Sequence, residues 1–142
     1  MRSIAKRTKW IIFALAIIST VACNNSDDVT EIFIGRDWKL TFIEEGGARR
    51  WPSQDRVYGL TFAANTFNAT TPSGGRIGGR WFADGRTREF RCSNISTQGI
   101  VASDTIATRM IEILREASSY DGDIHYLQIK TDKNHLMQFY NR

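Results

Sequence analysis

The sequence predicts an α+β fold that is mainly antiparallel β, with a curved sheet packed around one amphipathic helix. Short runs of alternating apolar and polar residues recur along the chain, and segments rich in glycine, asparagine and aspartate separate them. One later segment instead has apolar residues at helical spacing. A single amphipathic helix must bury its apolar stripe, and the sheet is the partner that this order of elements offers.

The first strand is expected at residues 37–42, where Trp38, Leu40 and Phe42 alternate with polar residues and would face the core. Asp84-Gly85 lies between two later strand-like runs and is typical of a hairpin turn. Loops are expected at 44–52 and 71–75. Further strands are expected at 58–63, 66–70, 77–82 and 87–92.

The helix is expected to begin at Ser103, a good N-cap, with Asp104 in the first turn, where the helix dipole favours an acid. Residues 121–123 end it. A hairpin of residues 124–130 and 135–140 then completes the chain. The expected apolar stripe consists of Ile106, Met110, Ile113, Leu114 and Ala117.

Three parts are expected along the chain. Residues 1–22 are predicted to be a signal peptide, because a basic start precedes an uncharged apolar run of 13 residues, too short to span a bilayer. Residues 23–34 are predicted to be an acidic flexible tether. Residues 35–142 are predicted to form a single domain, which suits the length of the chain.

The segment that ends at Cys23 resembles a bacterial lipobox, with Ala22 as the small residue before the cysteine. The resemblance implies that Cys23 is lipidated and becomes the first residue of the mature protein. The polar and acidic residues 24–28 resemble the export signal of Bacteroidetes lipoproteins. Together these resemblances imply an outer-membrane lipoprotein of the cell envelope, exposed at the surface and held on the membrane by its N-terminal lipid.

The net charge does not indicate a nucleic-acid partner. The whole chain carries +4, and the four basic residues of the expected signal peptide account for all of it, so the mature chain is formally neutral. The basic residues of the mature chain are nevertheless concentrated between residues 49 and 91. The candidate anion-binding residues are Arg49, Arg50, Arg56, Arg76, Arg80, Arg86 and Arg88.

Arginine binds carboxylate and phosphate through two parallel hydrogen bonds, so an arginine cluster beside Trp51 or Trp81 would suit an anionic glycan or glycolipid. The alternative is a solvated surface of mixed charge. Strand alternation would put Arg86, Arg88 and Phe90 on one face and Arg91 on the other, which divides the arginines between faces. Arg49, Arg50 and Arg56, in the long loop, would be free to converge on either rim.

No catalytic motif is present in the sequence, and the protein is expected not to be an enzyme. No cofactor is implied. His125 and His135 flank the last hairpin without a carboxylate or cysteine at ligand spacing, so no metal site is expected. Lipidation of Cys23 would leave Cys92 without a disulfide partner, and Cys92 is interpreted as a buried structural thiol.

Short motifs follow one another in a fixed order along the mature domain. They are Trp38-x-Leu40, Gly59-Leu60-Thr61-Phe62, Gly79-x-Trp81, Ile95-Ser96-Thr97, the helix up to Tyr120, Gly122-Asp123 and Leu127-x-Ile129. In this order they resemble the META domain family, typified by a heat-inducible bacterial lipoprotein. The resemblance implies a META-like fold and a non-enzymatic envelope protein that binds or supports another envelope protein, with a role in stress. The cysteine pair of that family is absent here.

The alternative is a lipocalin-like barrel that binds a small ligand in its interior, because Gly35-Arg36-Asp37-Trp38 resembles the opening of that fold. About 105 residues is short for eight strands and a helix. The two hypotheses differ in whether the helix fills the concave face of the sheet. A filled face would leave no ligand cavity.

Overall fold

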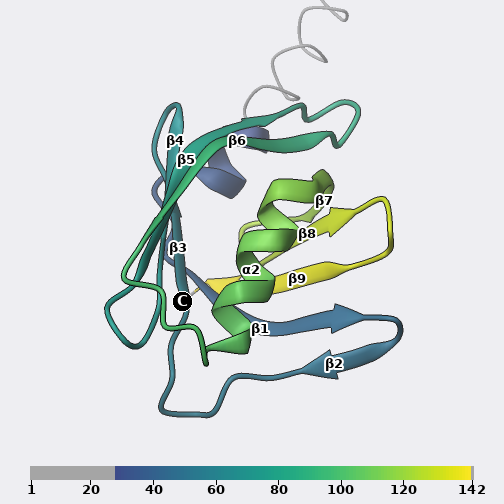
Figure 1. Cartoon of the computed structure of the whole chain (residues 1–142). Coiled ribbons are helices and arrows are strands. Elements are labelled where there is room, and N and C mark those ends of the chain that lie inside the picture. The colour runs from purple at the N-terminus through teal and green to yellow at the C-terminus, as the bar shows by residue number, and fades with distance from the viewer. Residues whose placement is uncertain (1–27, 142) are drawn as a thin grey trace, which may run out of the picture.

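The computed structural model describes residues 28–141 (Figure 1). The expected signal peptide, Cys23 and the first part of the expected tether lie outside these residues, so they stay predictions. No helix in the part of the chain that is described is long and apolar enough to cross a membrane.

Nine strands form one sheet within residues 28–141, and every neighbouring pair is antiparallel. The order across the sheet is β6-β5-β4-β3-β1-β9-β8-β7, and β2 pairs with β1 alone. The strands are β1 (Trp38–Glu45), β2 (Ala48–Arg50), β3 (Gly59–Phe62), β4 (Thr66–Thr70), β5 (Arg76–Ala83), β6 (Phe90–Gln98), β7 (Ala117–Gly122), β8 (Tyr126–Thr131) and β9 (Leu136–Asn141).

The sheet curls into a nearly closed barrel, because its two outermost strands approach each other. Glu89, next to β6, forms an isolated antiparallel bridge with Ser119 of β7. The Tyr120 N–H donates to the Arg88 carbonyl at 3.0 Å. The mainly antiparallel β architecture expected from the sequence is confirmed, with two short helices added to it: residues 28–33 and α2 (Thr105–Glu116).

The core is rich in aromatic rings. Phe33 is the centre of an aromatic cluster, with its ring centroid 5.0 Å from that of Phe62, 5.5 Å from Phe90 and 4.9 Å from Tyr120. The buried side chains of α2 join the same core, namely Ala107, Met110, Ile113 and Leu114. The stripe expected from the sequence is therefore confirmed at Met110, Ile113 and Leu114, while Ile106 and Ala117 are only partly buried.

The expected tether is corrected at its C-terminal end. Residues 28–33 are helical, and Ile32 and Phe33 are almost completely buried. The indole N–H of Trp38 donates to the Ile32 carbonyl at 3.1 Å, which fixes this helix to β1. Two apolar residues embedded in an acidic stretch were enough to bury it, because an aromatic side chain in the core outweighs the local polar composition.

Helix α2 differs from the prediction at both ends. Its N-cap is Asp104 rather than Ser103, because the Asp104 carboxylate accepts the Ala107 N–H at 3.0 Å. It ends at Glu116, and the residues expected to continue it form β7. Ser118 and Ser119 are poor helix formers, and the chain gains more by pairing β7 with β8.

Phe42 is buried as expected, but it lies outside the main core cluster. A β-bulge between Leu40 and Phe42 shifts the alternation of β1 by one residue. Ile43 therefore joins the core cluster, while Phe42 pairs with Gln138 and contacts the ring of Trp51. Trp38, Phe90 and Leu114 share one core as expected.

The strand expected at 87–92 begins late. Arg88 has φ +63°, the left-handed region, so residues before Phe90 belong to the hairpin loop, and β6 runs on to Gln98. The predicted common face of Arg86, Arg88 and Phe90 therefore does not form. The hairpin between β5 and β6 is confirmed, as is the final hairpin of β8 and β9.

Candidate ligand-binding surface

The aromatic cluster and the buried side chains of α2 belong to one apolar core. The clefts described below lie on the surface. One of them lies beside residues 51–57, which connect β2 to Tyr58 before β3 and are called loop 51–57 here. This loop carries the most exposed aromatic ring among the described residues, Trp51, whose exposed fraction is 59%.

Loop 51–57 is fixed to β1 and to the start of α2. The Leu40 N–H donates to the Tyr58 carbonyl at 2.9 Å, and the Arg56 N–H donates to the Ser53 carbonyl at 2.9 Å. The hydroxyl of the buried Tyr58 donates to the Asp104 carboxylate at 2.7 Å. Burial first, and then the hydrogen bond to Asp104, raise the pKa of Tyr58, so its hydroxyl stays protonated as the donor.

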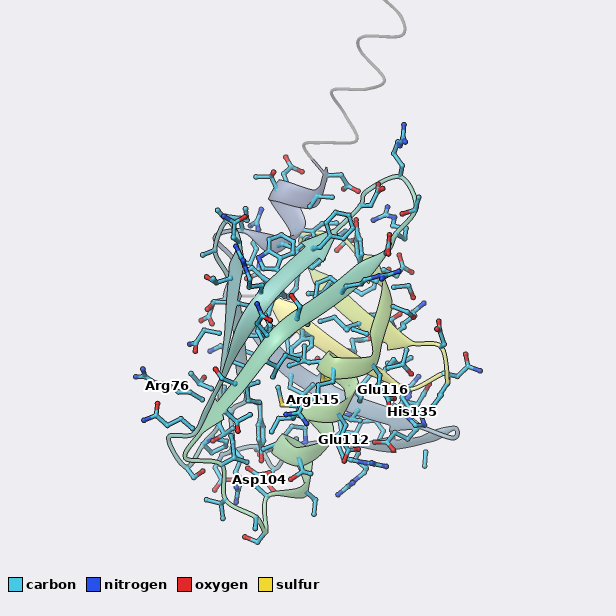
Figure 2. All side chains as sticks on the ribbon, turned by 45° about the horizontal axis from the view of Figure 1, so that its top comes forward. Arg76, Asp104, Glu112, Arg115, Glu116 and His135 are labelled. Atoms are coloured by element: carbon cyan, nitrogen blue, oxygen red, sulfur yellow. The ribbon has the colours of Figure 1, made fainter. Side chains whose placement is uncertain are left out.

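Two arginines of this region reach the same helix end. The Arg56 guanidinium lies 3.7 Å from the free Oδ2 of Asp104, and the Arg50 guanidinium donates to the Thr105 hydroxyl at 2.6 Å. Asp104 therefore caps α2 with one oxygen and faces Arg56 with the other. Figure 2 shows Asp104 at the end of the molecule opposite the short helix of residues 28–33.

Arg49 faces the other way. In the register of β1 and β2, Arg49 pairs with Glu44 and Arg50 with Ile43, so the two arginines point to opposite faces. The Arg49 side chain donates to Glu44 at 2.7 Å and stacks over the Phe42 ring at 4.4 Å. Trp51 lies on the same ring, with centroids 5.8 Å apart. Phe42 thus serves as a platform for one arginine and one tryptophan.

A cleft of about 180 Å³ opens between loop 51–57 and β1. Its lining combines an apolar wall with amide, hydroxyl and cationic groups, which suits a sugar ring that carries an acidic group. The buried Thr41 hydroxyl, in the lining, has no hydrogen-bond partner within the described residues. The cleft is lined by Lys39, Leu40, Thr41, Pro52, Ser53, Gln54, Arg56, Val57 and Tyr140.

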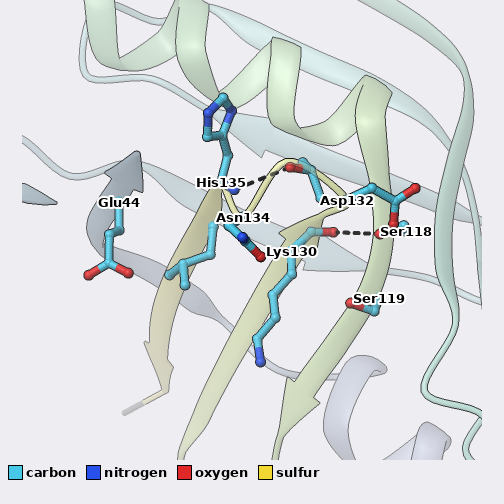
Figure 3. Close-up of a pocket in the computed structure, with 9 residues that line it drawn as sticks. Glu44, Ser118, Ser119, Lys130, Asp132, Asn134 and His135 are labelled. Atoms are coloured by element: carbon cyan, nitrogen blue, oxygen red, sulfur yellow. Dashed lines mark hydrogen bonds between the residues drawn. The ribbon is translucent and has the colours of Figure 1, made fainter. Parts of the chain in front are cut away.

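The outer face of β1, β9 and β8 continues from this cleft. Alternate residues of β8 and β9 are buried, so the others point outward. Among these, Gln128 and Gln138 are joined by a hydrogen bond of 2.7 Å. At the far end of the face lies a polar pocket of about 450 Å³ (Figure 3). Lys130, Ser119 and Glu44 from three different strands line it.

Of the two histidines, His135 lines this pocket, and its backbone N–H donates to the Thr131 hydroxyl at 3.3 Å. His125 lies after β7, and its backbone N–H donates to the Asp123 carboxylate, which shapes a turn. Within residues 28–141 no group of three or more histidine, cysteine or acidic side chains is arranged to hold a metal ion. The pocket is thus a polar cleft of mixed charge.

The remaining candidate arginines lie elsewhere. Arg76 and Arg80 are exposed on β5, and Arg86 is in the β5–β6 hairpin loop. Arg88 contacts Asp28 at 3.3 Å and its guanidinium lies 5.2 Å from the Tyr120 ring centroid, so it closes the barrel. The structure therefore divides the seven candidates into two groups: Arg49, Arg50 and Arg56 around loop 51–57, and Arg76, Arg80, Arg86 and Arg88 along β5 and its hairpin.

Cys92 faces inward beside Trp81 of β5 and is partly buried against the core. Burial raises the pKa of its thiol to about 12, because a thiolate would lose its solvation there. The thiol is therefore protonated at neutral pH, as expected for a structural cysteine. Of the two tryptophans that the sequence placed beside the arginines, Trp51 is exposed, whereas Trp81 is partly buried against the core.

The chain is thus a small, nearly closed antiparallel barrel with an apolar core and clefts on its surface. A model of the family described as "Domain of unknown function (DUF4847)" matches residues 53–141. This match covers more than half of the chain, which therefore belongs to the DUF4847 family. No curated protein matches the chain.

Two solved structures share the fold. A crystal structure of a DUF4847 family protein from Bacteroides vulgatus is 24% identical, with a TM-score of 0.60 over 79% of this chain and 96% of that chain. An NMR structure of a protein from Burkholderia xenovorans is 14% identical, with a TM-score of 0.62 over 78% of this chain and 83% of that chain.

The expected membership of the META domain family is wrong, because the family match and the structure from Bacteroides vulgatus both point to DUF4847. The short matches that suggested it, such as Trp38-x-Leu40 and Leu127-x-Ile129, are alternating core positions of β1 and β8. Any antiparallel sheet with a filled core offers such pairs, so they do not discriminate between families. The stress role implied by that resemblance has no further support.

Proposed function

We propose that this protein is a lipid-anchored, non-enzymatic binding protein of the cell envelope, and that its ligand is an anionic glycan held at loop 51–57. The observation that carries the proposal is the combination of the exposed Trp51 with an adjacent polar cleft and with Arg49 and Arg56. A tryptophan face suits the apolar face of a sugar ring. A guanidinium suits its carboxylate or phosphate.

We infer that the ligand binds on the surface, because α2 leaves no room for it inside the barrel. We infer that the sheet wraps around α2, because the helix contributes four fully buried side chains to the same core as β1, β8 and β9. Figure 1 agrees with this arrangement, since α2 lies against the concave side of the strands. A lipocalin-like ligand would have to displace Met110 and Leu114, so the structure favours a surface ligand over an interior one.

The envelope location rests on the resemblance of the segment ending at Cys23 to a lipobox. Replacing Cys23 by alanine in the full chain should abolish fatty-acid labelling and release the protein from membranes. The matched variant Cys92→Ala keeps Cys23 and should stay labelled. Unchanged labelling of the Cys23→Ala protein would refute the anchor.

The ligand proposal is tested with the chain carrying Cys23→Ala and a lipid-free acidic polysaccharide, polygalacturonate, as the acidic probe, with dextran as the neutral control. Binding should weaken steeply as salt rises, because exposed charges are screened beyond about 10 Å at 0.1 M. Trp51→Ala should weaken it about threefold to tenfold, the size of an aromatic contact. Phe82→Ala removes an almost equally exposed ring from another part of the surface and should leave binding unchanged. Absence of binding at low salt would refute the proposal.

A further inference from the structure

The described chain begins at one end of the barrel and is held there. Ile32 and Phe33 lie in the core, and the Arg36 guanidinium donates to the Glu31 carbonyl at 2.8 Å. Asp28, the first described residue, lies 3.3 Å from the guanidinium of Arg88 in the β5–β6 hairpin. The point at which the chain enters the fold is therefore fixed beside this hairpin, as Figure 1 shows.

The hairpin and the short helix form one continuous end of the molecule. The Phe33 ring is 4.9 Å from Trp81 of β5 and 5.5 Å from Phe90 of β6. Ile34, which is 38% exposed, bridges to Phe62 at the end of β3. This region, residues 28–37 with the hairpin 80–91, is called the hairpin end below.

The hairpin end contains the described residues that are closest to Cys23 along the chain. Only four residues lie between Cys23 and Asp28, so five residue steps join them. At about 3.3–3.6 Å per residue, an extended chain of that length reaches about 18 Å at most. The eight residues of β5 alone span about 26 Å at the usual strand rise. A lipid on Cys23 therefore brings the hairpin end, rather than loop 51–57, to the membrane.

The side chains of the hairpin end suit the headgroup layer of a bilayer. Phe82 is 53% exposed and points outward between Arg80 on its own strand and Arg91, its partner across the strand pair. The three residues line an open groove of about 760 Å³ on this part of the surface. Aromatic rings prefer the membrane–water interface, and arginine is attracted to anionic lipid headgroups.

The charges of the hairpin end are almost balanced. Arg91 is paired with Glu89 at 2.5 Å, and Arg88 with Asp28, while Arg80 and Arg86 form no ion pair within the described residues. Asp84 and Glu31 lie in the same region. This surface alone would hold a bilayer weakly, so the affinity comes from the lipid and the orientation from the surface.

We propose that the hairpin end is a docking surface for the lipid bilayer, with Phe82 at the headgroup layer and Arg80 and Arg86 facing lipid phosphates. The proposal rests on lipidation of Cys23, and it adds the orientation of the domain: loop 51–57 points away from the membrane, toward solvent and ligand.

The test compares two labelled positions in the full lipidated protein, reconstituted into vesicles of phosphatidylethanolamine and phosphatidylglycerol. Phe82→Cys and Val57→Cys form a matched pair, because their side chains are 53% and 49% exposed and lie at opposite ends. Both variants also carry Cys92→Ala, which removes the other free thiol. The Cys23 thiol is blocked by its acylation, so a fluorophore reacts only at the introduced cysteine. Some of the phospholipids carry a quencher just below the headgroup.

Quenching should be at least threefold stronger at position 82 than at position 57. Equal quenching, or stronger quenching at position 57, would overturn the orientation while leaving the lipid anchor intact, provided that both proteins float with the vesicles. A protein that does not float with the vesicles would overturn the lipidation and, with it, the orientation. A third label at Arg76→Cys, at the opposite end of β5, should be quenched less than the label at position 82.

Discussion

Loop 51–57 and the hairpin end both present an exposed aromatic ring among arginines, yet the two regions hold their arginines differently. Around loop 51–57, each arginine has a fixed partner on another element: Glu44 for Arg49, Thr105 for Arg50 and Asp104 for Arg56. At the hairpin end, the outermost arginines, Arg80 and Arg86, have no such partner among the described residues.

This difference separates a preorganised surface from an adaptable one. A ligand that binds guanidinium groups already held in place loses less conformational entropy on binding, which favours a defined ligand. Arginines without fixed partners around a single exposed ring can instead adapt to an uneven and mobile surface, such as a layer of lipid headgroups. The same residue types therefore suit a glycan at one end and a membrane at the other.

A substitution in the core that both ends share should cause the largest loss of stability. Leu114 is completely buried on α2, so Leu114→Ala should lower the free energy of unfolding by about 2–5 kcal/mol. Glu112→Ala, an exposed position of the same helix, should change it by less than about 0.5 kcal/mol. Urea unfolding measures both. A loss below about half a kcal/mol for Leu114→Ala would mean that α2 does not hold the two ends together.

Breaking the contact between α2 and loop 51–57 should lower the stability by an intermediate amount and should affect only this end of the molecule. Asp104→Ala removes the helix cap and the partner of Tyr58 and Arg56, and should cost about 1 kcal/mol or somewhat more. It should also weaken glycan binding, because Arg56 loses its fixed position.

Asp104→Asn serves as the control. Its amide oxygen can still accept the Ala107 N–H, so most of the helix stability should remain, while the charge that attracts Arg56 is lost. If Asp104→Ala destabilises the fold but leaves glycan binding unchanged, then loop 51–57 does not depend on this contact.

The sequence predicted the barrel's core more completely than its surface. Strand patterns located β3, β4, β8 and β9 to within two residues, and Trp38 and Leu40 lie in the core as predicted. In β1 the bulge at Thr41 placed the buried Phe42 outside the main core cluster, where it forms the platform for Trp51 and Arg49, and brought Ile43 into that cluster instead. A bulge is set by long-range pairing, and local composition does not reveal it.

The hairpin of β1 and β2 and the contacts of the arginines were not predicted either, for different reasons. The hairpin of β1 and β2 did have a local signal: Gly46 and Gly47 both adopt positive φ, as in a tight two-residue hairpin turn. The positions of the arginines had no such signal. Only the folded chain brings Arg56 to Asp104, 48 residues further along, or Arg88 to Asp28.

Acid sensitivity of the hairpin gives the smallest expected effect. The hydrogen bond from the Arg86 N–H is the main cause that lowers the pKa of Asp84 below its usual value. A lowered pKa in the folded state stabilises the protein above the unfolded pKa, and this contribution is lost as the pH falls through the folded value. As the pH drops below about 4, the melting temperature should therefore fall, and it should fall slightly less in Asp84→Asn. An identical fall in that variant would assign the acid sensitivity to other carboxylates.

The most direct test of the division between the two ends is to remove arginines from each end in turn and measure binding of the lipid-free acidic polysaccharide, polygalacturonate, at low salt. The triple replacement of Arg49, Arg50 and Arg56 by serine should weaken binding at least about tenfold, or about 1.4 kcal/mol, and flatten its salt dependence. The double replacement of Arg80 and Arg86 should leave binding within about twofold of the parent chain. Equal losses in the two variants, or a larger loss at the hairpin end, would contradict the assignment of ligand and membrane to opposite ends.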